Sequence, residues 1–212
     1  LIRLDQTVRS NVALDRGTVL FAAGQPMSKI YLVKSGALKT YAADEEGELQ
    51  ILGFHLPGEI VGFDGLADDK HRCSAEALSR ASVCEVPFDR LESVAAQIPG
   101  LQRQLMRVVS REVVKDHEHL VMMGRRQAMD RLAIFLHSLA SRYKRLGFSG
   151  DEFILPMSRY ELANYLGLVV ETVSRLFTKL AEMGVLEVER KTIRILDHAR
   201  LEAMIGDEHA AE

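Results

Sequence analysis

Short apolar runs separated by glycine or proline mark the first half of the chain. Between about residues 14 and 95 these breakers recur at intervals suited to short strands. The pieces between them are rich in β-branched and aromatic residues, as at 18–21, 30–33 and 49–54. Runs of this length, bounded by turn residues, are typical of antiparallel strands. The pattern predicts an N-terminal antiparallel β-roll or barrel.

A long helix is predicted where this pattern stops. Residues 101–123 contain no glycine or proline. Apolar positions there recur at spacings of three, four and seven, which is the helical period. The stripe starts at Ile98, just before this segment, and continues through Leu105, Val109, Val113, Leu120 and Met123. A helix that links two domains has one side left to cover, so this stripe either packs within its own domain or forms a dimer seam.

A charged residue interrupts the predicted seam. Asp116 is in register with Leu105, Val109, Val113 and Leu120, where a two-fold axis would bring a carboxylate toward its own copy. Like charges at such a position destabilise association. Two interpretations remain open: Asp116 lies at the edge of the seam and stays hydrated, or it holds a dimer near its association threshold.

The last part of the chain has the order of a winged helix-turn-helix. An amphipathic helix is expected over 127–146, and Ser158 and Glu161 have the spacing of a capping box before a short helix. Gly167 supplies a tight turn into a second helix that ends at Gly184, and a hairpin follows over 185–188 and 192–196. We therefore expect an α+β protein with a β-roll domain (1–97), a long dimerisation helix (98–124) and a winged helix-turn-helix domain (125–212).

The second helix of this motif has two contrasting faces. Its apolar residues suit burial, whereas its polar residues suit a major groove, which is wide enough for a helix. Glu171, Ser174 and Arg175 are candidates for base edges, and Thr172, Lys179 and Arg159 for phosphates. The alternative is that Glu171 and Arg175, four residues apart, form only a surface ion pair.

Composition narrows the class of protein. The chain is 47% hydrophobic with a net charge of -3, and residues 125–200 carry 13 basic against 9 acidic side chains, whereas residues 1–100 carry 10 against 14. That excess is compatible with a polyanion such as double-stranded DNA. No apolar run approaches the ~18 residues of a membrane span, and no secretory signal is evident. Two cysteines cannot form a disulfide framework, so we expect a cytoplasmic protein without a membrane partner.

The motif residues resemble a known family. "MSRYELANYLGLVVETVSRLFTKLAEMGVL" resembles the DNA-binding domain of the CRP/FNR family of bacterial transcription regulators, and "VETVSR" is similar to its FNR branch. "GFHLPGEIVGFDGL" and "SVCEVPFDRL" are similar to that branch's sensory roll. The resemblance implies a homodimer that binds a TTGAT-type palindrome through Glu171, Ser174 and Arg175. The resemblance also implies contacts from exposed loops to RNA polymerase. Val170 stands where CRP-type proteins have arginine, which agrees with a TTGAT half-site.

The resemblance to a cyclic-nucleotide-binding fold raises the question of that ligand. Ribose and cyclic phosphate need a glutamate, an arginine and a small hydroxyl. The position that matches the family's glutamate is Phe63, and its Arg-Ser pair is matched by Arg72 and Cys73. Because Phe63 cannot accept a hydrogen bond, we do not expect cyclic nucleotide binding.

Cys84 is the candidate metal ligand. A single cysteine in a strand is often a small buried apolar residue, but thiolates also hold iron-sulfur clusters. "ASVCEVPF" is similar to the place where FNR-type oxygen sensors keep one cluster cysteine apart from the other three. The resemblance therefore implies a [4Fe-4S] cluster in an oxygen-responsive activator, with the remaining ligands upstream of Leu1. Cys73 has no matching role, and a family member without a cluster is the alternative.

Other chemistry finds little support in the sequence. There is no phosphate loop, nucleophile elbow or zinc-binding spacing among the seven histidines. Glu45 and Glu46 beside Gly47 have the character of a solvated hairpin tip. A haem sensor that uses one histidine is a minor alternative, and we do not expect an enzyme.

Overall fold

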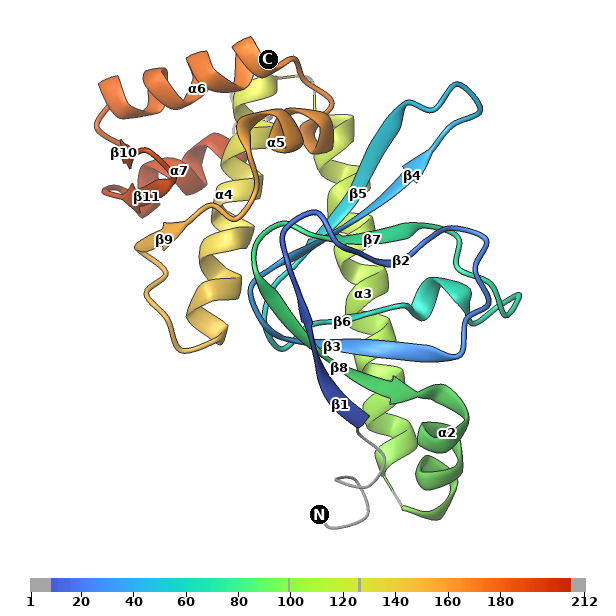
Figure 1. Cartoon of the computed structure of the whole chain (residues 1–212). Helices are drawn as coiled ribbons and strands as arrows, with labels where there is room; N and C mark the ends of the chain where they lie inside the picture. The colour runs from blue at the N-terminus through green and yellow to red at the C-terminus, as the bar shows by residue number, and fades with distance from the viewer. Residues whose placement is uncertain (1–8, 99, 126, 207–212) are drawn as a thin grey trace. The chain divides into compact units, whose positions relative to one another are not determined.

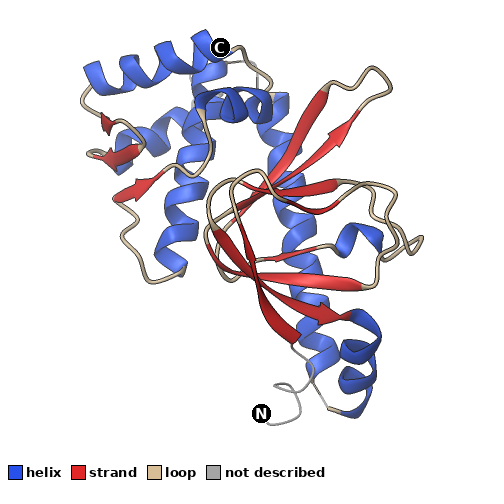
Figure 2. Ribbon diagram, in the orientation of Figure 1, coloured by secondary structure: helices blue, strands red, loops and turns tan. Residues whose placement is uncertain are grey.

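The computed structural model describes residues 9–98, 100–125 and 127–206, and it divides into two compact units between Asp116 and His117. The first unit is built mainly of short strands, and the second mainly of helices (Figures 1 and 2). This agrees with the predicted α+β class and its order of elements. The boundaries expected at 97/98 and 124/125 stay predictions.

Eight strands in the described part of the first unit form two four-stranded antiparallel sheets. One sheet has the order β1-β8-β3-β6 and the other β2-β7-β4-β5. The strands are β1 (Arg9–Leu14), β2 (Val19–Phe21), β3 (Lys29–Ser35), β4 (Leu38–Ala43), β5 (Leu49–His55), β6 (Ile60–Val61), β7 (Ser74–Ala77) and β8 (Ala81–Pro87). Beyond Tyr41, β4 pairs only with β5, so this hairpin projects from the roll (Figure 1).

The core of the roll is made by side chains that alternate inward along these strands. Phe21, Val33, Leu38 and Val83 are at most 3% exposed and belong to one cluster. Burial of this kind contributes ~25 cal/mol for each Å² of apolar surface removed from water. The β3–β4 turn depends on Gly36, which has φ 73°, and a Cβ there would lie 2.4 Å from the Arg80 carbonyl oxygen.

Helices follow the last strand of the roll. A short η1 helix (Phe63–Gly65) lies between β6 and β7, and α2 (Phe88–Gln97) follows β8 directly. A single helix, α3 (Leu101–Gly124), then runs for 24 residues and confirms the predicted long helix. Leu105 of α3 packs against a second roll cluster that contains Met27, Ile30 and Leu91.

The second unit is a helical domain with a small sheet. Its helices are α4 (Ala128–Arg145), α5 (Arg159–Leu166), α6 (Val170–Glu182) and α7 (His198–Gly206), and its strands are β9 (Glu152–Ile154), β10 (Leu186–Glu189) and β11 (Thr192–Ile195). The strands form one antiparallel sheet of order β10-β11-β9. The succession α5, turn, α6, hairpin confirms the predicted winged helix-turn-helix.

Candidate nucleic-acid interface

The first helix of the motif begins with the predicted capping box. The Ser158 hydroxyl accepts a hydrogen bond from the Glu161 backbone N–H at 3.1 Å, and the Ser158 N–H donates to Glu161 Oε2 at 2.8 Å. Without these side chains, the two backbone N–H groups would have no partner within the helix. Leu162, Ala163 and Leu166 then bury the inner face of α5. The start of α5 is thus fixed by local chemistry.

A left-handed glycine joins α5 to α6. Gly167 has φ 62° and ψ 41°, a conformation that costs other residues ~1–2 kcal/mol. Arg131 of α4 holds the same turn, because its Nη1 donates to the Leu166 carbonyl oxygen at 3.1 Å. Sequence reasoning missed Arg131, since nothing in its local pattern distinguishes it from a solvated arginine.

Helix α6 separates an apolar face from a polar one. Val173, Phe177 and Leu180 are at most 3% exposed and anchor the helix in its domain. Glu171, Ser174, Arg175 and Lys179 are exposed, and Thr172 is half-buried. The predicted base-contacting residues therefore share the solvent side of one well-anchored helix.

The polar face is ordered by contacts within the helix. Ser174 Oγ donates to the Val170 carbonyl oxygen at 2.9 Å, and Arg175 Nη2 donates to Thr172 Oγ1 at 3.3 Å. Among the described residues, no ion pair joins Glu171 to Arg175. The surface ion pair that would have explained this spacing without DNA is therefore not formed.

Arg159 lies in an unusual setting for a cation. Its Cζ is 3.3 Å from the centre of the Phe177 ring, and its Nη1 is buried without a hydrogen-bond partner in the described structure. Burial lowers the pKa of Arg159 to about 10. At neutral pH the guanidinium remains charged and has an unused donor. Stacking on an aromatic ring partly stabilises such a cation.

The hairpin after α6 forms the wing. Glu187 pairs with Arg194 across β10 and β11, and Arg194 Nη1 lies 2.7 Å from Glu187 Oε2. Arg194 also lies 2.8 Å from Glu152 on β9, so three strands share one charge cluster. Arg190, with φ 55°, turns the chain at the exposed tip beside Lys191.

The exposed side of α3 is partly apolar. Val113 is 46% exposed and Leu120 is 70% exposed, whereas a role of these residues in a dimer seam stays a prediction. Val109 is half-buried, whereas Leu105 faces the roll cluster. Met106, seven residues before Val113, is 61% exposed on this side of the helix. The helical period alone did not separate these two faces.

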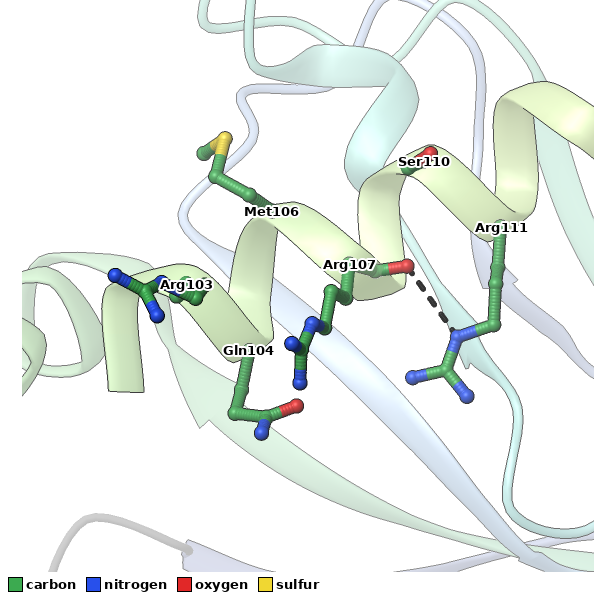
Figure 3. Close-up of a pocket in the computed structure, with 6 residues that line it drawn as sticks. All are labelled: Arg103, Gln104, Met106, Arg107, Ser110 and Arg111. Carbon is green, nitrogen blue, oxygen red and sulfur yellow. Dashed lines mark hydrogen bonds between the residues drawn. The ribbon is translucent and has the colours of Figure 1, made fainter. Parts of the chain in front are cut away.

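Asp116 and a row of arginines border this side of α3. Asp116 is exposed and close enough to the roll to raise the pKa of the Cys73 thiol, although burial and Asp64 raise it more. Arg103, Arg107 and Arg111 lie at intervals of four along a shallow surface shared with Met106 (Figure 3). Arg111 Nε donates to the Arg107 carbonyl oxygen at 3.3 Å.

The residues that match the family's nucleotide-binding positions make other contacts within the roll. Phe63 packs against the second roll cluster, and Arg72 pairs with Asp68. Asp64, next to Phe63, accepts hydrogen bonds from the backbone N–H groups of Arg72 and Cys73 at 2.7 and 3.2 Å. At position 63 there is no acceptor for a sugar hydroxyl, and the neighbouring carboxylate already has donors.

The two cysteines have different surroundings. Cys73 is 7% exposed in the roll core, and its thiol pKa is raised to about 12, chiefly by burial. Cys84 lies on β8, where its Sγ is 3.4 Å from Asn11 Oδ1 of β1. A [4Fe-4S] cluster needs four ligands, and the described residues contain no group of three or more side chains placed to hold a metal ion. Cys84 can supply one thiolate, but these residues do not form a cluster site.

A β-roll followed by a long helix and a winged helix-turn-helix defines the class of two-domain DNA-binding regulators. Residues 11–97 match the cyclic nucleotide-binding domain, and residues 130–204 match the Crp-like helix-turn-helix domain. The chain belongs to the CRP/FNR family of transcription regulators, and its relatives place it in the FNR branch.

The relatives extend over nearly the whole chain. The transcriptional activator protein Anr of Pseudomonas protegens is 46% identical over 96% of this chain and 83% of its own length. The anaerobic regulatory protein of Pasteurella multocida is 42% identical over 97% of this chain and 76% of its own. The solved structure of FixK2 from Bradyrhizobium japonicum has a TM-score of 0.83 at 31% identity and covers 92% of this chain and 96% of that one.

These relatives also decide between regulator and enzyme. They are transcription regulators, so the protein is a regulator and not an enzyme, as predicted. Within the described residues, no helix combines the length and the apolar character that crossing a membrane requires.

Proposed function

We propose that the protein is a homodimeric transcription activator that binds a TTGAT-type palindrome in double-stranded DNA. Glu171, Ser174 and Arg175 read base edges in each half-site: the carboxylate accepts from cytosine N4, and the guanidinium donates to guanine O6 and N7. The observation that carries the proposal is the solvent side of α6, which presents these residues without an ion pair between Glu171 and Arg175.

Phosphate contacts position the helix in this proposal. Thr172 lies between Glu171 and Ser174, Lys179 lies one turn after Arg175, and Arg159 supplies a half-buried cation at the start of α5. Arg159 as a whole is only half-buried, so a phosphate oxygen would pair with its charge through the accessible part of the side chain. Such contacts contribute affinity without reading sequence.

The dimer is formed by α3. Met106, Val113 and Leu120 lie at intervals of seven, which suits a seam between two parallel copies of the helix. Such a dimer places two copies of α6 on half-sites about one helical turn apart, which gives a palindromic target. Asp116 borders the seam and weakens association through like-charge repulsion between the copies.

DNA binding is tested by measuring fluorescence anisotropy on a labelled duplex with two inverted TTGAT half-sites. Specific binding should exceed binding to a scrambled duplex by roughly 10³-fold or more at the same salt concentration. Equal affinity for both duplexes would contradict the proposal. A duplex with one half-site serves as the control for dimeric binding.

Anaerobic control is the second part of the proposal, and it is supported by the names of the relatives Anr and anaerobic regulatory protein. In this proposal Cys84 is one ligand of a [4Fe-4S] cluster whose other ligands lie outside the described residues. Iron and sulfide assays on protein expressed from its natural start and purified without oxygen test this. A preparation without iron and sulfide would favour the alternative, a cluster-free regulator.

The remaining partners follow from the function of an activator. We expect the protein to act in the cytoplasm and to contact RNA polymerase through exposed loops. The β4–β5 hairpin offers such a loop, with an acidic tip beside Leu49 and Leu52, which are 48% and 42% exposed. Cyclic nucleotide binding is not part of the proposal, because Phe63 replaces the acceptor that ribose needs.

A further inference from the structure

The start of α6 departs from ordinary helix design. Its N-cap residue is Val169, with φ -83° and ψ 151°, and no side chain caps the helix. The Val169 carbonyl oxygen accepts from the N–H groups of Thr172 and Val173 at 3.0 and 3.2 Å, so the backbone geometry is that of a normal N-cap. Only the side-chain acceptor is absent. Valine is among the poorest N-cap residues, whereas serine, threonine, aspartate and asparagine are favoured.

The same domain shows what an ordinary start looks like. Helix α5 begins with Ser158 and a complete capping box, only eleven residues earlier in the sequence. Val169 is also 63% exposed, so its isopropyl group does not contribute much to the core. The residue thus neither caps the helix nor packs the domain, and both losses disfavour the folded state.

A function in DNA recognition accounts for both features. The N-terminal residues of a recognition helix are the ones that reach base edges. In the major groove, thymine presents a methyl group that only an apolar contact can use. A serine, aspartate or asparagine that turned inward to cap α6 would have no such surface to offer. Val170, the next residue, is half-buried in its own domain.

We propose that Val169 is a specificity-determining residue that packs its exposed isopropyl group on a thymine methyl group in each half-site. The inference rests on the proposed DNA-binding function and adds one residue to it. Glu171, Ser174 and Arg175 read hydrogen-bonding edges, whereas Val169 reads a methyl group. The helix cap is given up for this contact.

Replacement of thymine by deoxyuridine tests the inference, because it removes the methyl group and keeps the base pair. Each thymine of the inverted TTGAT duplex, on either strand, is replaced in turn in both half-sites. For the wild-type protein, one position should weaken binding by about fourfold per half-site, the effect of one buried methyl group. For Val169→Ser, the same position should have no effect while the other positions behave as in the wild type.

The thermal stability of the wild type and of Val169→Ser gives a second readout. Val169→Ser should raise the Tm by roughly 2 to 8 °C, because it restores a helix cap. Ile154, 61% exposed on β9, offers a matched control. Ile154→Ser removes a similar exposed side chain away from α6 and should keep the full deoxyuridine response.

The outcomes separate this inference from the function on which it rests. If the wild type does not prefer the TTGAT duplex over a scrambled one, the proposed function fails. If it does prefer that duplex and yet the wild type and Val169→Ser respond alike to every deoxyuridine, only the thymine contact is overturned. A Val169→Ser protein that gains no thermal stability would contradict the argument from the missing cap.

Discussion

The guanidinium carbon of Arg159 lies 3.3 Å from the centre of the Phe177 ring, which ties the first helix of the motif to the inner face of the second. The Nη1 atom of the same side chain is buried without a hydrogen-bond partner in the described structure. A buried donor that lacks a partner costs free energy in the unbound protein. The rest of the side chain is only half-buried, so its charge can still be paired by a phosphate oxygen that approaches from solvent.

Arg159→Met should therefore separate stability from DNA binding. Methionine keeps an apolar stem on Phe177 and removes the unpaired donor, so the free energy of unfolding should stay within about 1 kcal/mol of wild type or rise. DNA affinity should fall equally on specific and scrambled duplexes, and the salt slope should decrease by about 0.9 for each lost phosphate contact. Urea unfolding and anisotropy titrations at several salt concentrations measure both. An unchanged salt slope would exclude the phosphate contact.

The turn between α5 and α6 can be tested through Gly167. Its φ of 62° is unfavourable for alanine, and a Cβ there would lie 2.7 Å from Met123 Cε. Gly167→Ala should lower the free energy of unfolding by about 1–2 kcal/mol. Asparagine tolerates this conformation better, so Gly167→Asn should cost less. Equal losses in chemical unfolding for both variants would show that crowding, and not the backbone conformation, sets the cost.

The two sides of α3 predict different mutant phenotypes. Val113→Glu places a charge on the exposed side and should weaken dimer association, as measured by sedimentation equilibrium. Leu105→Ala removes a side chain from the roll cluster and should instead lower the stability of the roll by about 2 kcal/mol or more. Asp116→Ala should strengthen association of the dimer, measured in air by the same method, because it removes the repulsion between the Asp116 carboxylates of the two copies. The account of the seam fails if Val113→Glu associates as the wild type does.

Cys73 predicts a loss of stability at alkaline pH. Its thiol pKa is raised from 9.0 to about 12 in the folded roll, so the native state holds the proton longer than the unfolded chain does. The stabilisation from the neutral thiol is complete below about pH 9 and is lost as the pH rises from 9 to 12. Urea unfolding of the wild type should lose up to about 1.4 kcal/mol per pH unit there relative to Cys73→Ser. Parallel pH curves for the two proteins would contradict this assignment.

Local signals in the sequence predicted most of the fold. The Ser158–Glu161 capping box, the Gly167 turn and the apolar face of α6 depend on residues within one or two helical turns, and all three are confirmed. The breakers of the first half likewise predicted a roll, because strand lengths are set by neighbouring turn residues.

Features that depend on tertiary packing were not accessible in this way. Leu105 and Met106 are adjacent in sequence, yet one packs on the roll and the other is exposed. Helical periodicity identifies an apolar stripe but not what covers it. The burial of Arg159 over Phe177 and the contact of Arg131 with the α5–α6 turn likewise join residues 18 or more positions apart in the chain. The missing cap at Val169 was visible in the sequence only once the start of α6 was known.

The central claim, that the polar face of α6 reads bases, is tested most directly by a thermodynamic cycle between Arg175 and the guanine of TTGAT. Affinities of the wild type and Arg175→Ala are measured by anisotropy on the TTGAT duplex and on one with that guanine–cytosine pair replaced by adenine–thymine. The wild type should lose about 1–3 kcal/mol on the altered duplex, and Arg175→Ala should bind both duplexes equally. If Arg175→Ala loses the same affinity on every sequence and keeps the preference for guanine, Arg175 contacts phosphate and the claim is contradicted.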